Sequence, residues 1–277
     1  MTSAPAARPG LLGGPVERDR EARLAALLPP IAIGVVVLLV WEIGLSVLGV
    51  RQFLLPKPSV IAGAIADQWP VLQRGLAYTG FEALAGLAVG VSFGVLAAFA
   101  TARWGVAREI LMPVAIGASS IPIIAFAPIT SAWFSSESPL SRIAIVTLMV
   151  FFPVMINTVR GLTNVDPAAI ELMRSYAAGE LTIVRKVRIP NAVPYFFTAL
   201  RIAATLAVIG AVIGEYFGGP RYSLGIYITS EAYVFRYQNA WAAIVMACLL
   251  GIAFYLGAML LERLAVPWQR SDRAAEP

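Results

Sequence analysis

The stretch YTGFEALAGLAVGVSFGVLAAFA, residues 78–100, decides the fold class of this chain. It carries one charge, Glu82, and it is long enough to cross a bilayer, which takes about 20 mostly apolar residues in an α-helix. Small residues recur every four positions on one face: Gly86, Gly90, Gly94 and Ala98. Because small residues let two backbones approach closely in lipid, the stretch predicts a transmembrane helix with a second helix packed on that face.

Other apolar stretches of similar length lie at residues 28–49, 110–129, 143–159, 195–217 and 240–264. Of the 277 residues, 59% are hydrophobic and 13% are charged, and the mean hydropathy is +0.78. A soluble domain carries about 25% charged residues. The sequence therefore predicts an all-α polytopic membrane protein with six transmembrane helices. The first stretch lacks a convincing cleavage site, so we expect it to remain in the mature protein.

The tails and the orientation follow from composition and charge. Residues 1–27 are rich in Ala, Pro, Gly and Arg without apolar periodicity, which is typical of a disordered tail. With a cytoplasmic N-terminus, most of the 21 Lys and Arg residues fall in inner segments, as the positive-inside rule favours. We therefore expect cytoplasmic tails at 1–27 and 266–277 around a membrane domain at 28–265.

Composition also excludes several kinds of site. The chain has no histidine, so imidazole metal ligation and an imidazole base are excluded. Its one cysteine, Cys248, lies in an apolar run and cannot form an internal disulfide. The net charge of +5 is explained by basic inner loops rather than by nucleic acid. No catalytic residue, metal or cofactor is expected.

Charged residues within the spans are costly in lipid and are therefore candidates for function. Glu82, Arg142 and Glu215 are all expected near the outer ends of their helices. They could form an outer gate or the mouth of a substrate path, or they could be a structural ion pair. Arg201 is expected near the cytoplasmic end, where it could snorkel to the interface or meet the last carbonyls of a neighbouring helix, and Glu42 has no obvious partner.

The stretch at 110–129 is interrupted by Pro113, Pro122 and Pro128, each of which removes a backbone donor and is expected to bend the helix. Ser119 and Ser120 precede the second proline and could bond the backbone groups that it frees. Broken backbone at membrane depth needs protein or a cavity to cover it. We expect Ser119, Ser120 and Pro122 in the wall of a translocation path, with a kink that serves packing alone as the alternative.

One inner loop, residues 160–194, is too long and too patterned to be a simple connector. Asp166 and Pro167 predict a helix start as N-cap and first-turn proline, and Gly179 is expected to end that helix. A second short amphipathic segment, 180–188, is expected to follow. Two such helices would form a compact projection into the cytoplasm, or a hairpin that lies on anionic lipid.

Pro190 and Pro194 are expected to close this projection. Its sequence resembles the coupling signature of permease subunits of binding-protein-dependent ABC importers, which reads EAA, three residues, Gly, nine residues, then I-x-L-P. The matching positions are Glu171, Val187, Ile189 and Pro190. Ala177 stands where that family carries glycine, and Gly179 is expected to make the turn instead.

The resemblance extends beyond the loop. Residues 55–59, 121–134 and 190–219 are similar, in the same order, to the sulfonate, taurine, nitrate and thiamine-precursor branch of the family. It implies an ABC type I importer permease fold of six helices in the bacterial inner membrane. The ATPase-coupling residues that it implies are Glu171, Arg174, Ala177, Gly179, Val187, Ile189 and Pro190.

The same resemblance implies partners: cytoplasmic ABC ATPase subunits, an extracytoplasmic solute-binding protein and a second copy of the permease. Neither Lys57 nor Lys186 follows a glycine, so the phosphate-binding Gly-Lys step of an ATPase is absent and the chain is expected to be a transport subunit. The form Glu-Leu-Met-Arg-Ser at 171–175 resembles permeases for heteroaromatic compounds of the hydroxymethylpyrimidine or riboflavin type.

Two other classes remain as alternatives. A secondary transporter or channel would need a coupling-ion site near the midplane, for which Glu42 is the deep carboxylate. A membrane-embedded enzyme would need a Ser–Lys dyad that involves Lys57 or Lys186, and both lie in expected loops. Neither alternative explains the patterned cytoplasmic projection.

Overall fold

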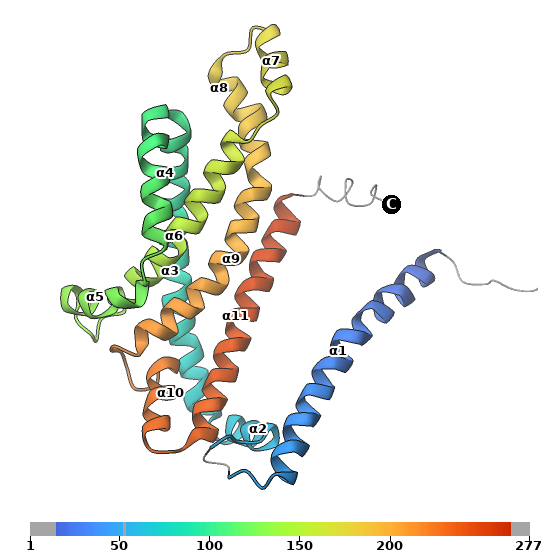
Figure 1. Ribbon diagram of the computed structural model, residues 1–277, viewed down its shortest axis with the longest axis vertical. Helices are drawn as coiled ribbons and strands as arrows, with labels where there is room; N and C mark the ends of the chain where they lie inside the picture. The colour runs from blue at the N-terminus through green and yellow to red at the C-terminus, as the bar shows by residue number, and fades with distance from the viewer. Residues whose placement is uncertain (1–14, 52–53, 267–277) are drawn as a thin grey trace, which may run out of the picture. The chain divides into compact units, whose positions relative to one another are not determined.

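The computed structural model describes residues 15–51 and 54–266, and all regular structure in these residues is helical (Figure 1). The helices, in chain order, are α1 (Pro15–Val47), α2 (Pro58–Asp67), α3 (Trp69–Arg103), α4 (Gly105–Ser119), the short η1 (Ile123–Phe126), α5 (Ala127–Phe134), α6 (Pro139–Thr163), α7 (Pro167–Ser175), α8 (Glu180–Ile183), η2 (Val184–Arg188), α9 (Ile189–Glu215), α10 (Leu224–Tyr233) and α11 (Tyr237–Ala265). The all-α fold class is therefore confirmed.

Six segments in the described part of the chain are long and apolar enough to cross a membrane. Five are single spans: Leu28–Val47, Trp69–Arg103, Pro139–Thr163, Glu180–Glu215 and Tyr237–Ala265. The sixth is a bent pair, Glu109–Ser119 with Ile123–Phe134, whose axes meet at 88°. All six correspond to the apolar stretches of the sequence, and several helices extend beyond their apolar part.

The chain divides into two units, residues 1–60 and 61–277. In the first unit α1 begins at Pro15, within the tail for which no regular structure was expected, while residues 1–14 lie outside the described part. Glu42 has a partner after all: its carboxylate accepts hydrogen bonds from the Ser59 N–H (3.0 Å) and the Ser59 hydroxyl (2.8 Å) at the start of α2. A carboxylate there stabilises the first turn of the helix.

In the second unit α6 lies between α3 and α9, and the glycine face of α3 packs directly on α6. A Cβ atom at Gly90 would lie 2.8 Å from the Thr147 carbonyl oxygen and 2.9 Å from the Val150 Cβ. At Gly94 it would lie 3.0 Å from the Phe151 carbonyl oxygen. The predicted stripe of small residues is therefore confirmed as a helix–helix contact.

On its other side α6 meets a second face of small residues, on α9. Ala203 and Ala207 are fully buried, and a Cβ atom at Gly210 would lie 2.7 Å from the Met149 sulfur. Since hydrophobic burial drives little association between helices in lipid, such close van der Waals packing holds the three helices together.

The expected end of the projection at Pro190 and Pro194 is wrong. α8 continues through one π-helical turn, η2, directly into α9, so a single helix runs from Glu180 to Glu215. The Ile189 N–H donates to the Val184 carbonyl five residues back, and Pro190 follows with no N–H to donate. The wider turn gives the proline ring room beside the preceding carbonyls, which is why the helix continues.

Candidate functional site

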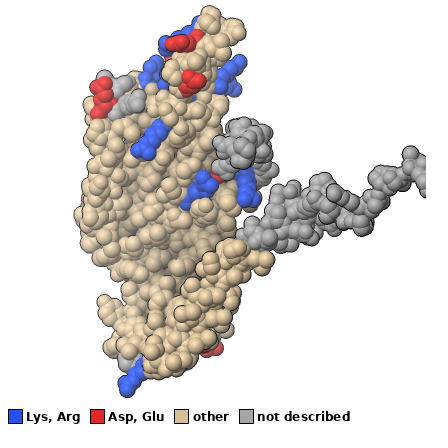
Figure 2. All heavy atoms as spheres, turned by 45° about the vertical axis from the view of Figure 1, so that its right-hand side comes forward, with Lys and Arg blue, Asp and Glu red and all other residues tan. Residues whose placement is uncertain are grey.

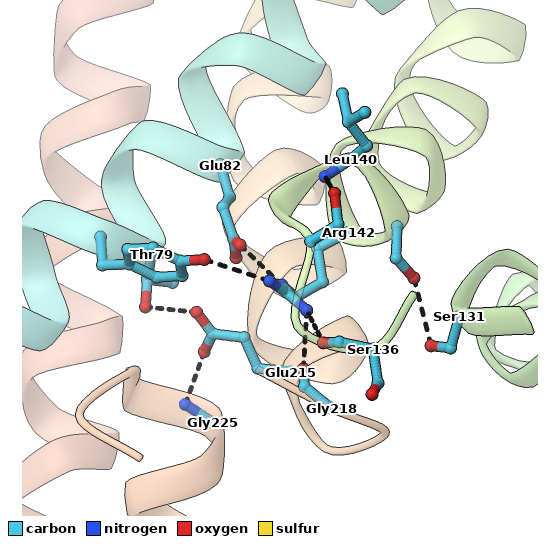
Figure 3. A network of polar contacts seen from close by, with 12 residues as sticks. Thr79, Glu82, Ser131, Ser136, Leu140, Arg142, Glu215, Gly218 and Gly225 are labelled. Carbon is cyan, nitrogen blue, oxygen red and sulfur yellow. Dashed lines mark hydrogen bonds and ion pairs between the residues drawn. The ribbon is translucent and has the colours of Figure 1, made fainter. Parts of the chain in front are cut away.

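Three charges from different helices meet in a buried polar cluster, which consists of Tyr78, Thr79 and Glu82 of α3, Arg142 of α6 and Glu215 of α9 (Figure 3). Arg142 Nε lies 2.6 Å from Glu82 Oε1, and the two side chains are 1% and 0% exposed. A charge buried this deeply needs a partner, and each supplies one for the other.

The guanidinium group of Arg142 also connects two loops. Its Nη1 donates to the carbonyl oxygens of Ser136 (2.8 Å) and Gly218 (2.9 Å), and its Nη2 donates to the Tyr78 hydroxyl at 3.1 Å. Gly218 has φ +154°, and a Cβ there would lie 2.7 Å from the Ser136 Cβ. Arg142 therefore ties the segment before α6 to the segment after α9, at a point where the two backbones are too close for a side chain.

Glu215 and Thr79 hold the N-terminus of α10. Glu215 Oε2 accepts from the Gly225 N–H at 2.6 Å, and Glu215 Oε1 accepts from the Thr79 hydroxyl at 2.7 Å. The Leu224 N–H donates to Thr79 Oγ1 at 3.2 Å. Ser223, the N-cap residue by position, makes no capping bond. The first two N–H groups of α10 are thus satisfied by side chains distant in sequence, and a carboxylate is favourable at a helix N-terminus.

This geometry fits the structural alternative for the cluster, because its charged groups bond each other and the backbone. It joins α10 to α3, to the first turn of α6 and to the end of α9. Nearby, burial raises the pKa of Tyr227 on α10 to about 12, with a smaller contribution from Glu231. The phenol therefore stays protonated at neutral pH and donates to Gln68 Oε1 at 3.3 Å. A role of the cluster as an outer gate stays a prediction.

The broken third span has one break, and it lies at Pro122. This residue precedes η1 with φ −61° and ψ 98°, outside the helical region, and the two halves meet at 88°. Pro113 lies inside α4 and Pro128 lies in the first turn of α5. The proline at the break is therefore the one that ends a helix, while the other two lie within helices.

The hydroxyls of Ser119 and Ser120 bond the end of α4, but they do not bond the carbonyl that Pro122 frees, that of Ala118, which accepts from the Ile121 N–H. Both hydroxyls donate to the Ile116 carbonyl oxygen, at 2.7 and 3.4 Å respectively. Ser119 also faces a cleft of about 270 Å³ between α4, η1, α6 and α9. Its other lining residues are Ile121, Ile123, Met149, Phe152, Pro153 and Leu206. The residues expected along one path therefore lie in two places, with Ser119 in this cleft and Glu82, Arg142 and Glu215 in the polar cluster.

The projection begins where the sequence predicts. The Asp166 carboxylate accepts from the Ala168 N–H at 2.9 Å and caps α7, and Pro167 is the first helical residue. Its end differs from the prediction. The Ala178 N–H donates to the Met173 carbonyl and the Ala177 N–H to the Arg174 carbonyl, which is the Schellman pattern.

Ala177, rather than Gly179, takes the left-handed conformation at this turn, with φ +54°. Gly179 has φ −68° and is the N-cap of α8, so the expectation that Gly179 ends the first helix is wrong. The turn falls at the position where the resembling family carries glycine. The sequence reasoning failed because it moved the turn to the nearest glycine, although the pattern of backbone bonds fixes it two residues earlier.

We call α7 and α8 together the coupling segment, after the family signature that their sequence resembles. Their exposed surface combines charged and apolar groups. Arg174 and Glu180 form an exposed ion pair at 3.0 Å. Leu172, Tyr176 and Leu181 are 56%, 77% and 81% exposed. The segment lies at the end of α6 and α9 opposite to α10, and charged side chains gather there in the face shown in Figure 2.

The sequence reasoning missed some of the residues that complete the polar cluster. Thr79 lies three residues before Glu82 and so on the same face of one helix, which was a usable signal. Gly218 and Gly225 contribute backbone groups, for which no side-chain signal exists. Arg201 was expected to snorkel or to meet the last carbonyls of a neighbouring helix; its Nε lies instead 3.4 Å from Glu262 Oε2 on α11.

These features define a polytopic helical membrane protein in which α7 and the start of α8 project at one end of the bundle. Residues 90–271 match the family described as "Binding-protein-dependent transport system inner membrane component", and the chain belongs to this family. It is thus a multi-pass transport protein of the bacterial inner membrane.

Named relatives cover most of the chain. It is 30% identical over 250 residues to the formylaminopyrimidine transport permease protein of Halalkalibacterium halodurans, covering 88% of this chain and 97% of that protein. It is 30% identical to the riboflavin transport system permease protein of Chloroflexus aurantiacus, covering 84% and 87%. A solved structure titled "Crystal structure of an amino acid ABC transporter with histidines" matches with TM-score 0.59 at 15% identity, covering 72% of this chain and 96% of that one.

Proposed function

We propose that this chain is the permease subunit of an ATP-driven importer, and that the coupling segment docks a separate ATPase chain. The observation that carries the proposal is the exposure of Leu172 and Tyr176 outside the spans, together with that of Leu181 in the first turn of the helix that begins at Glu180. Large apolar side chains grouped on a polar surface are typical of a protein–protein contact. Two copies would enclose the translocation path, and a solute-binding protein would deliver the solute to the opposite end.

The proposal requires the coupling segment on the cytoplasmic side, with both termini on that side. Exposed basic residues at this end support the orientation: Arg160, Arg174, Arg185 and Lys186. Single cysteines placed at Glu171 and Glu137, in a Cys248→Ala background, test it directly. We expect a membrane-impermeant maleimide to label E137C in intact cells and E171C only in inverted vesicles. Labelling of E171C from outside would reverse the orientation.

Docking is tested by reversing one exposed charge. Glu171 lies on α7 and is exposed, so Glu171→Arg leaves the packed helices intact while changing the proposed contact. We expect the tagged variant to lose co-purification of the ATPase chain. Glu137→Arg, the same change at an exposed site before α6, is the matched control and should retain it. Equal recovery of the ATPase with both variants would count against the coupling role.

The secondary-transporter alternative depended on Glu42 as a site for a coupling ion. In the first unit this carboxylate is engaged by two hydrogen bonds from Ser59, so no specific observation favours that alternative. In the sequence no lysine follows a glycine, as the phosphate-binding loop of an ATPase requires, and this supports hydrolysis of ATP by another chain.

For the solute, we propose a heteroaromatic compound of the hydroxymethylpyrimidine or riboflavin type. Two relatives named for such compounds, formylaminopyrimidine and riboflavin, are each 30% identical to this chain over most of its length, which supports this class. A relative named for aliphatic sulfonates, from Escherichia coli, is 28% identical over 83% of the chain. Uptake of labelled hydroxymethylpyrimidine, riboflavin and taurine by cells with and without the permease decides between them, and uptake of taurine alone would overturn the assignment.

A further inference from the structure

A groove of about 590 Å³ lies at the end of the bundle that carries the coupling segment, separate from the polar cluster and from the cleft at Ser119. Its lining comes from the last turns of α3 and α6 and from α8 and η2. The residues that carry the argument are Phe99, Arg103, Leu162, Leu181, Val184 and Arg188. The groove thus combines a largely apolar wall with two arginines.

The depth of the groove can be read from the elements that border it. Arg103 is the last residue of α3, and Leu162 is in the last turn of α6, so the groove lies where two membrane spans end. Trp104 follows Arg103 and is 59% exposed. Tryptophan is enriched at the level of the lipid headgroups. The two arginines therefore lie at that level, and Phe99, one turn deeper on α3, lies on the hydrocarbon side.

The described lining of the groove carries two arginines and one carboxylate, so its net charge is positive. Glu180, the carboxylate in its lining, is already paired with Arg174 on α7. Arg188 Nε is buried and has no hydrogen-bond partner among the residues that the structure describes. Arg103 forms no ion pair within that part of the chain. Buried donors are nearly always bonded, so Arg188 points to an acceptor from outside the described residues.

We propose that this groove binds an anionic phospholipid, with its phosphate between Arg103 and Arg188 and an acyl chain along Phe99, which is 38% exposed. Guanidinium groups form strong charge-assisted hydrogen bonds to phosphate oxygens. Basic pockets between helices at the cytoplasmic face are suited to anionic headgroups. The assignment to the cytoplasmic leaflet rests on the orientation proposed above. Because Glu180 both lines the groove and pairs with α7, the bound lipid would lie directly beside the coupling segment.

The test uses the full-length protein, alone and assembled with its ATPase, and measures retained phospholipid by native mass spectrometry. The lipid supplied is phosphatidylglycerol in phosphatidylcholine. Arg103→Gln and Arg188→Gln should each weaken retention of phosphatidylglycerol about fivefold. Arg185→Gln removes an exposed charge on the same π turn outside the groove, and it should change retention less than about twofold. Arg103 is exposed at a helix end, so Arg103→Gln leaves folding intact.

Inorganic phosphate separates a lipid from a soluble anion. Phosphatidylglycerol should raise the melting temperature of the wild-type protein, whereas phosphate and phosphatidylcholine should not. An equal rise with phosphate alone would overturn the proposal in favour of a soluble anion. Retention that is unchanged in both groove variants would overturn it as well. Release of the lipid when the ATPase assembles would overturn the lipid site and assign the groove to the contact with the ATPase. A preparation that contains no ATPase would contradict only the docking proposal.

Discussion

Replacing Arg142 with methionine tests whether the buried polar cluster holds together the end of the bundle that carries α10. The change leaves the Glu82 carboxylate, which is 0% exposed, without its partner at 2.6 Å. It also removes the donor to the Ser136 and Gly218 carbonyl oxygens. Breaking one side of a buried ion pair costs about 3–5 kcal/mol of unfolding free energy. For a chain of this size we expect the melting temperature to fall by roughly 10 °C.

The assay is thermal unfolding of purified protein in one detergent, followed by the loss of the monodisperse peak in size-exclusion chromatography. Arg201→Met is the matched control, because Arg201 and Glu262 form an ion pair in the same bundle that is partly exposed and longer, at 3.4 Å. Partly solvated pairs contribute about 1 kcal/mol or less.

The double variant Glu82→Met with Arg142→Met separates two costs in unfolding free energy: the loss of the ion pair, and the burial of an unpaired charge. We expect it to be more stable than Arg142→Met alone, because apolar residues of similar size often replace a buried pair at little cost. If Arg142→Met melts no lower than Arg201→Met, the buried pair does not stabilise the fold as proposed. The same conclusion follows if the losses of stability in the single variants Glu82→Met and Arg142→Met add up to the loss in the double variant.

The remaining predictions concern backbone geometry. Gly90→Ala should destabilise the bundle by about 1–3 kcal/mol, because the new Cβ would lie 2.8 Å from the Thr147 carbonyl oxygen. Gly251→Ala, with nothing within 4 Å of the new Cβ, should stabilise α11 by about 0.5–1 kcal/mol, because alanine is favoured over glycine inside a helix. Melting temperatures compare the two variants, and equal values would contradict a close α3–α6 contact. Ala177→Gly should stabilise α7 locally by about 1 kcal/mol, because φ is +54° there, while Gly179→Ala should have little effect at φ −68°. Hydrogen exchange of the α7 amides measures this, and faster exchange in Ala177→Gly would contradict the assignment of the turn.

The spans and their tight packing were predictable from sequence, because both depend on local composition. An apolar run long enough to cross a bilayer is typical of a transmembrane helix. Glycines spaced by four residues leave one face of that helix without side chains, so a second helix can pack closely against it. The same holds for the cap at Asp166, where the residue and the proline after it act within one turn. These features are local, so one chain segment contains all the information.

The contacts within the polar cluster could not be predicted, because they join residues that are far apart in the sequence. Glu215 caps α10 together with Thr79, a residue 136 positions away, and the acceptors of Arg142 are carbonyl groups that any residue could supply. The turn at Ala177 was mislocated because residue type was given more weight than the backbone bonds of the helix end. The helix through Pro190 was missed because one π turn removes the conflict that a proline creates in a regular α-helix.

That π turn has a mechanical consequence. Because α8, η2 and α9 are one continuous helix of 36 residues, roughly 54 Å long, a displacement at Glu180 acts on the same helix that carries Glu215 at its far end. A tilt or rotation at the coupling segment would therefore reach the N-terminus of α10 without an intervening loop. One helix would thus connect the two faces of the membrane, and the Glu215 carboxylate at its far end is hydrogen-bonded to the N-terminus of α10, the helix that it would move.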